Sequence, residues 1–143
     1  MLRTTLVLML AATPAFAAPS CPTAVTDAIA KAFPKSKIDR CKSETEKGVT
    51  QFEVRLTKAD AKKVEVDVAA DGKILQIEEK IAPTELPDAV KKAFAAKYPK
   101  AKAERAEKQT AGSDVSYEIA FGTKEATFKA DGTFVEEEGE DRD

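Results

Sequence analysis

The sequence predicts an α+β fold built from two tandem repeats, each with one helix packed on about four antiparallel β-strands. Three observations predict it. The chain is similar to itself at a fixed offset, its apolar spacing changes from helical to strand-like within each copy, and an Asp-Gly pair interrupts the strand-like part of each copy. Self-similarity at a fixed offset indicates a repeated structural unit.

The offset is 65 positions over most of each copy, as in the match of Pro22 with Pro87. Near the end of each copy it falls to 60, so that Asp71-Gly72 matches Asp131-Gly132. The missing residues lie between Leu56 and Val64, where a shorter hairpin loop costs little because closure entropy depends only weakly on length.

Each copy is predicted to open with an amphipathic helix. The apolar residues of the first helix have helical spacing: Val25, Ala28, Ile29, Ala32 and Phe33. The second helix has a similar set: Leu86, Val90, Ala93, Phe94 and Tyr98. Pro22 and Pro87 suit a first helical turn, whereas Pro34 and Pro99 force the residue before them out of helical geometry.

Alternation with a period of two follows each helix and predicts half-buried antiparallel strands. The apolar members in the first copy are Phe52, Val54, Leu56, Val64, Val66 and Val68. The Asp-Gly pairs are typical of tight hairpin turns that need positive φ. A weaker strand is expected at 37–42 and at 102–107.

Residues 1–17 have the order of a secretory signal peptide: Arg3, an apolar run, and the small-residue exit Ala15-Phe16-Ala17. The run is too short for a membrane-spanning helix. We therefore expect a periplasmic or secreted protein with no membrane span after signal cleavage. Its predicted parts are repeats at 18–82 and 83–138 and an acidic tail at 139–143.

The charge balance argues against nucleic acid as a partner. The chain has 23 basic and 25 acidic residues and a formal net charge of −2, with no basic stripe to neutralise phosphates. Acidic residues gather from Glu136 to Asp143, which indicates a self-repelling, solvated end. Calcium capture by this segment is the alternative, although it lacks the ligand spacing of a calcium loop.

Cys21 and Cys41 are predicted to form a disulfide, since an exported chain meets an oxidising compartment. The first helix rises about 18 Å and the following chain can return about 20 Å, which brings the two cysteines together. The matching positions in the second copy are Leu86 and Ala106, an apolar pair. Two separate buried thiols and lipidation of Cys21 are the alternatives.

No catalytic residue, metal site or cofactor is predicted, and we expect that the protein is not an enzyme. The chain has no histidine, which removes Ser-His and Cys-His activation and the commonest zinc ligand. Glu78 and Glu79 are adjacent on a strand and point to opposite faces, so we expect them to be solvated.

The residues of the second copy resemble the PepSY-like family of exported proteins, which is related in fold to the β-lactamase inhibitor protein. The resemblance lies in Leu86-Pro87-Asp88-Ala89-Val90-Lys91-Lys92-Ala93-Phe94, Tyr98-Pro99-Lys100-Ala101, Ser116-Tyr117-Glu118-Ile119 and Phe128-Lys129-Ala130-Asp131-Gly132-Thr133-Phe134-Val135. It implies a non-catalytic module of a kind often suspected of binding or inhibiting another exported protein.

The leading hypothesis is therefore a binding or inhibitory module whose partner is another exported protein. The partner would contact the sheet face opposite the helices, where we expect these side chains: Gln51, Glu53, Arg55, Glu65, Asp67, Glu118 and Lys129. The same charges would equally serve to keep that face soluble. The alternative functions are a small-ligand or cation (calcium) binding protein and an enzyme that uses carboxylates alone.

Overall fold

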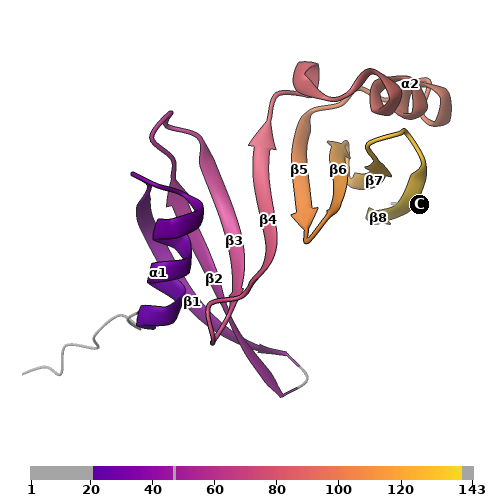
Figure 1. The fold of residues 1–143 in the computed structure, drawn as a ribbon. Helices are drawn as coiled ribbons and strands as arrows, with labels where there is room; N and C mark the ends of the chain where they lie inside the picture. Colours follow the sequence, from indigo (N-terminus) through magenta and orange to yellow (C-terminus); the bar gives the residue numbers. More distant parts are fainter. Residues whose placement is uncertain (1–20, 47, 140–143) are drawn as a thin grey trace, which may run out of the picture.

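The computed structural model describes residues 21–46 and 48–139. Helix α1 and strands β1–β4 come first, followed by a short 3-10 helix, helix α2 and strands β5–β8 (Figure 1). The bounds are α1 Thr23–Ala32, β1 Lys37–Glu46, β2 Val49–Thr57, β3 Lys63–Ala69, β4 Ile74–Ile81, η1 Pro83–Glu85, α2 Asp88–Lys97, β5 Arg105–Ala111, β6 Asp114–Phe121, β7 Lys124–Lys129 and β8 Phe134–Gly139.

The strands form one continuous antiparallel sheet in the order β1 to β8, each pairing with the next along the chain. The central joint is the β4–β5 pairing, which runs from Ile77 opposite Thr110 to Ile81 opposite Ala106. We refer to α1 with β1–β4 as the first half and to α2 with β5–β8 as the second half.

The predicted fold class, two tandem α+β repeats, is wrong. The chain forms a single eight-stranded, mostly β structure that carries only two ten-residue helices in its described part. An unpaired strand edge exposes a row of backbone donors and acceptors, and the β4–β5 pairing satisfies two such edges at once. Local sequence patterns identify strands but do not report which edges meet.

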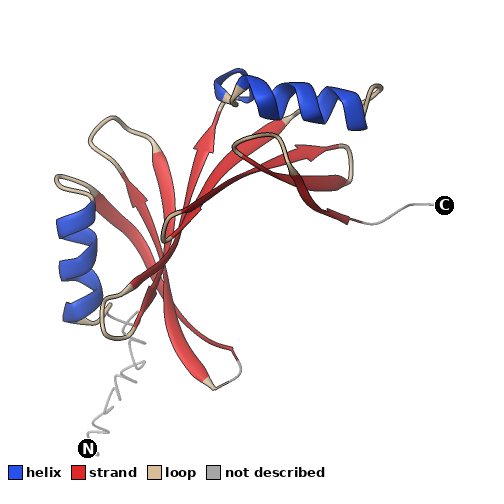
Figure 2. Ribbon diagram, turned by 45° about the vertical axis from the view of Figure 1, so that its right-hand side comes forward, coloured by secondary structure: helices blue, strands red, loops and turns tan. Residues whose placement is uncertain are grey.

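Within this architecture, both helices cover the same face of the sheet (Figure 2). Ile77 packs on the core beneath α1 and Ile81 on the core beneath α2. These residues are four apart on β4, and residues with an even separation on a strand project to the same face. The opposite face, which we call the open face, is therefore continuous across both halves.

Two separate hydrophobic cores hold the helices. Branched aliphatic side chains form the buried core of the first half: Val25, Ile29, Val54, Leu56, Val64, Val66 and Val68. Aromatic rings dominate the second core, where Phe94 lies 5.2 Å from Phe121 and 6.3 Å from Phe128, between ring centroids. At about 1.5–3 kcal/mol for each large side chain buried, these clusters supply the main force that fixes the helices.

The two Asp-Gly turns pack closely against the first turns of the helices. Gly72 has φ +89° and Gly132 has φ +88°, as the turn prediction requires. A Cβ on Gly72 would lie 2.7 Å from the carbonyl oxygen of Ala24, and one on Gly132 would lie 2.7 Å from that of Ala89. Any other residue there would strain the turn and also clash with the helix.

The predicted disulfide is confirmed. Cys21 and Cys41 are bonded with a Cα–Cα distance of 5.7 Å, which ties the start of α1 to β1. The bond rules out the alternatives of two free thiols and of lipidation at Cys21.

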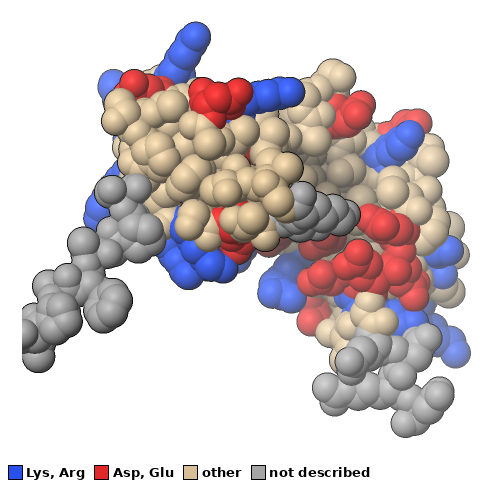
Figure 3. Space-filling view, turned by 90° about the horizontal axis from the view of Figure 1, so that it is seen from below, with Lys and Arg blue, Asp and Glu red and all other residues tan. Residues whose placement is uncertain are grey.

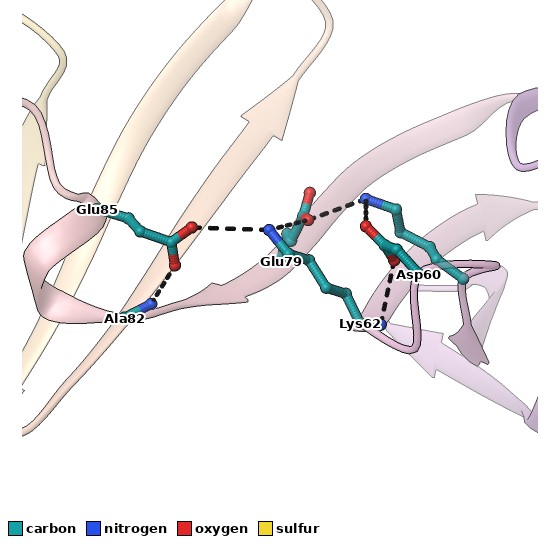
Figure 4. Close-up of polar contacts among 6 residues, drawn as sticks. Asp60, Lys62, Glu79, Ala82 and Glu85 are labelled. Atoms are coloured by element: carbon teal, nitrogen blue, oxygen red, sulfur yellow. Dashed lines mark hydrogen bonds and ion pairs between the residues drawn. The ribbon is translucent and has the colours of Figure 1, made fainter.

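The longer β2–β3 loop contacts the junction of the halves (Figure 4). Lys58 Nζ lies 3.0 Å from Glu79 Oε1, and Lys62 Nζ lies 3.7 Å from Glu85 Oε1. Glu85 also accepts a hydrogen bond from the backbone N–H of Ala82. Glu79 is therefore half-buried and ion-paired, which corrects the expectation that it is simply solvated.

The acidic end differs in part from the prediction. Glu136 to Glu138 belong to strand β8, where Glu137 accepts a hydrogen bond from the Tyr98 hydroxyl and lies 3.0 Å from Lys124 Nζ. Backbone pairing with β7 and these contacts outweigh the mutual repulsion of the acids. Residues 140–143 and the predicted signal peptide at 1–17 lie outside the described residues. Within the described residues, no helix is long and apolar enough to cross a membrane.

Candidate functional site

The structure places all seven predicted binding residues on the open face. On β2 and β3, Glu53 is opposite Asp67 and Arg55 is opposite Glu65, each alternating with buried core residues. In the second half, Glu118 is opposite Thr127, and Lys129 is opposite Ser116. Gln51, opposite Ala69 at the end of the β2–β3 ladder, completes the set.

The predicted set of binding residues includes none from the central strands β4 and β5, which join its two groups. Glu78 lies opposite Glu65 on one side and Gln109 on the other. Glu107 lies opposite Lys80 and Glu118. On β4, Ile77, Glu79 and Ile81 point to the face that the helices cover, so their polar neighbours in sequence point to the open face. Only the β4–β5 register shows that the open face continues from β3 to β6.

A hollow of about 390 Å³ lies beside these central strands. It is lined by basic and acidic side chains in equal number, together with two core residues: Asp39, Arg40, Arg55, Leu56, Lys63, Val64, Glu65, Glu78, Lys80 and Glu107. Its basic members lie chiefly on β1–β3, and its acids reach β4 and β5. Seen from below, acidic side chains gather over the second half, on the right (Figure 3).

Four half-buried carboxylates on β3–β6, which we call the central carboxylates, lack an ion-pair partner among the described residues. They are Asp67, Glu78, Glu107 and Glu118. Glu78 accepts a hydrogen bond from the Gln76 amide at 2.7 Å, and Glu118 accepts one from the Gln109 amide at 3.0 Å. Amides therefore stand where cations would neutralise the charge.

Burial raises the pKa of three of these groups. For Asp67, desolvation is the main cause, and the charges of Glu65, Glu53 and Glu44 raise the pKa further. For Glu118, desolvation again leads, and Glu125 and Glu107 add to it.

Desolvation also leads for Glu78. Its hydrogen bond from Gln76 lowers the pKa, whereas Glu107, Glu65 and Asp67 raise it. Glu78 is thus half-buried and has a raised pKa, which corrects the expectation that it is merely solvated. Burial therefore makes the charged form of Asp67, Glu78 and Glu118 less favourable than it is in water.

The two halves differ in how they treat equivalent carboxylates. In the first half, Arg55 Nε lies 3.1 Å from Glu53 and 2.8 Å from Glu65. Glu118 and Glu125 occupy the corresponding places in the β6–β7 pairing, where Ala120 is opposite Glu125. Ala120 therefore stands in the place of Arg55. Glu125 lies 3.7 Å from Arg105 Nη2 on β5, whereas Glu118 has no ion-pair partner among the described residues.

The described residues contain no group of three or more His, Cys, Asp or Glu side chains arranged to hold a metal ion. The carboxylates are spread along the sheet instead of converging on a point. No observation in the described part therefore favours the calcium alternative over the docking of a larger partner.

No family model matches the chain, and no curated protein matches it either. Solved structures do match. A BLIP-like protein from Bacteroides fragilis is 21% identical, with a TM-score of 0.67 and coverage of 82% of this chain and 86% of that chain. A DUF2874 family protein from Bacteroides uniformis is 15% identical, with a TM-score of 0.70 and coverage of 82% and 88%.

A third neighbour, from Bacteroides eggerthii and provisionally assigned to the periplasm, is 16% identical, with a TM-score of 0.70 and coverage of 84% and 89%. Together these structures show a BLIP-like fold. They do not single out the PepSY-like family. The sequence prediction of a periplasmic or secreted protein agrees with the provisional description of the third neighbour.

Proposed function

We propose that the protein is a non-catalytic exported module that binds another exported protein on its open face, as an adaptor or inhibitor. The observation that carries the proposal is the open face itself. It spans all eight strands. Within the described part of the chain, no helix covers it, and its centre holds half-buried carboxylates without ion-pair partners.

The size and chemistry of this face suit a protein partner. With strands about 4.8 Å apart, eight strands make a surface more than 30 Å wide, which is large enough for a standard interface of roughly 800 Å² on each side. The BLIP-like fold of the neighbours and the resemblance to PepSY-like sequences support the same reading. Both are analogies of fold and cannot identify the partner. The chemistry of the partner must therefore be inferred from the residues of the open face.

The test is capture from an extract of exported proteins by three immobilised forms of the chain. The face variant carries Glu53→Lys and Glu118→Lys, two positions on the polar side of their strands. The control variant carries Asp27→Lys and Asp88→Lys, which change the net charge equally but lie exposed on the helices. Circular dichroism establishes that all three forms are folded.

We expect a protein that the wild type and the helix control retain and that the face variant loses. Equal retention by the face variant and the control would refute binding through the open face. Retention of nothing by any form, from extracts made under several growth conditions, would refute a soluble exported partner.

A further inference from the structure

The uncovered sheet face also carries information about the chemistry of its occupant. Two pairs of carboxylates lie directly opposite each other across neighbouring strands: Glu65 with Glu78 on β3–β4, and Glu107 with Glu118 on β5–β6. Like charges directly opposite each other on one face destabilise a sheet. The fold therefore gains nothing from this arrangement by itself.

Among the described residues, only one of these four carboxylates, Glu65, has an ion-pair partner, which is Arg55. Arg55 is shared by Glu53 and Glu65. Lys80 lies opposite Glu107 in the register, yet no ion pair joins them in the described part of the chain. The equivalent of Arg55 in the second half is Ala120, and the nearby Arg105 pairs with Glu125. In the part of the chain that the structure describes, Glu118 therefore has no ion-pair partner.

The spread of the charges indicates the shape of what would neutralise them. From β3 to β6 the central carboxylates cover about 14 Å across the strands, at about 4.8 Å per strand. One metal ion cannot bridge that span, and the described residues contain no group arranged to hold one. An extended chain with several cationic side chains matches the span.

We propose that the open face binds a basic, extended segment of its partner, whose Lys or Arg side chains contact Glu78, Glu107 and Glu118. This inference rests on the proposed function and names the chemistry of the partner. One partner cation takes the place beside Glu118 that Arg55 takes beside Glu53. The hollow, which Glu78 and Glu107 line together with four basic side chains, receives an uncharged flanking part of the segment.

The experiment measures binding of a fluorescein-labelled peptide of alternating lysine and glycine by fluorescence anisotropy at low ionic strength. A glutamate–glycine peptide of the same length is the probe control. The protein forms are the wild type, the Gln variant Glu78→Gln with Glu118→Gln, and the matched control Asp27→Asn with Asp88→Asn. The last two lose the same number of negative charges.

A fourth form, Ala120→Arg, tests the comparison between the halves. Because Glu125 already lies 3.7 Å from Arg105, the introduced guanidinium should pair with Glu118, as Arg55 pairs with Glu53, and so compete with the peptide for that carboxylate. Because arginine is larger than alanine, its melting temperature is checked first. The Gln variant keeps the proposal testable if Ala120→Arg does not fold.

We expect the wild type and the matched control to bind the lysine peptide alike, and the Gln variant to bind it roughly tenfold more weakly, a difference of one decade in Kd. Equal losses in the Gln variant and the matched control would overturn the proposal, because binding would then follow net charge alone. Failure of the wild type to prefer the lysine peptide over the glutamate peptide would also overturn it.

The two proposals fail separately. A partner captured through the open face, together with no preference for the lysine peptide, would leave the proposed function standing and refute the basic segment. Peptide binding with the expected variant pattern, but no captured protein, would support the cation-binding chemistry and refute the exported protein partner.

Discussion

Each half of the sheet holds one helix against the same face, but the two halves do so with different interactions. In the first half, small branched side chains form the core, and the Cys21–Cys41 bond ties α1 to β1. In the second half, Leu86 and Ala106 are both buried in a core built around aromatic rings. The difference indicates that a covalent tie and aromatic packing are alternative ways to fix the same helix.

The halves differ also at their last strands, β4 and β8. In the second half, the Tyr98 hydroxyl donates to Glu137 on β8, and Lys97 Nζ lies 4.0 Å from the centre of the Phe134 ring. Strand β8 is thus held to α2 by side chains, whereas β4, its counterpart, is paired on both sides. A terminal strand without a second neighbour depends more on such contacts.

The largest expected effect is on the aromatic core. Phe94→Ala should lower the free energy of unfolding by about 3–5 kcal/mol, because it removes a buried ring and leaves a cavity. Phe33→Ala should cost less, because Phe33 is only partly buried at the rim of the first core. Urea unfolding near neutral pH measures both, and a larger loss at Phe33 would show that the first half also depends on an aromatic anchor.

The disulfide prediction uses the second half as a template. Removing the bond with Cys21→Ser and Cys41→Ser should cost about 3 kcal/mol, the entropy expected for a loop of this length. Cys21→Leu with Cys41→Ala copies the second half and should recover part of that loss through apolar contact. Thermal unfolding of both forms tests this, and equal losses would mean that the first half has no room for the apolar solution.

Tyr98→Phe tests how β8 is held to α2. Burial, followed by the hydrogen bond to Glu137, raises the pKa of Tyr98 to about 12. Loss of the hydroxyl should cost about 0.5–1.5 kcal/mol near neutral pH. Because the pKa is raised on folding, the wild-type advantage is complete below the ordinary tyrosine pKa and is lost as pH rises toward 12.

Chemical denaturation of both forms from neutral to alkaline pH measures that advantage. The wild type and Tyr98→Phe share every lysine, so lysine titration cancels in their difference. A difference that stays constant up to the most alkaline pH would show that the hydroxyl is not buried in the folded protein.

Much of the local structure could be predicted from the sequence because it depends on neighbours in the chain. Proline positions marked both helices, and the Asp-Gly pairs marked two turns whose positive φ only the backbone of glycine tolerates easily. The predicted strand at 37–42 is longer in the structure, and the one at 102–107 begins later, at Arg105. Strand ends depend on pairing partners, which local patterns do not contain.

The candidate site could be predicted only within each hairpin. Alternation on β2, β3 and β6 identified members of the open face within single hairpins, such as Glu53 and Glu118. The contribution of Glu78 and Glu107 depends on the β4–β5 pairing between residues about 30 apart in sequence, which also overturned the predicted fold class. Long-range register, more than local pattern, decides which charges become neighbours.

The smallest expected effect on stability comes from the same substitution at Glu118 and at Glu53, which occupy equivalent places in the two halves. Glu118→Gln should raise the free energy of unfolding by about 0.2–1 kcal/mol, because it removes a like-charge pair with Glu107. Glu53→Gln should lower it slightly, by up to about 1 kcal/mol, because it breaks the ion pair with Arg55. Chemical denaturation near neutral pH should therefore give opposite signs for one and the same substitution.

The pH dependence of the Glu118→Gln gain identifies its cause. Burial raises the pKa of Glu118 first, and Glu125 on β7, Glu107 on β5 and Glu78 on β4 raise it further, against a hydrogen bond from Gln109. A carboxyl whose pKa is raised on folding contributes stability at low pH that is lost as pH rises through the raised value. The gain from Glu118→Gln should accordingly be present near neutral pH and disappear as pH falls below the ordinary glutamate pKa. A gain of equal size at acidic pH would trace it to packing instead of charge, and the open face would then hold no repulsion between carboxylates for a cationic partner to relieve.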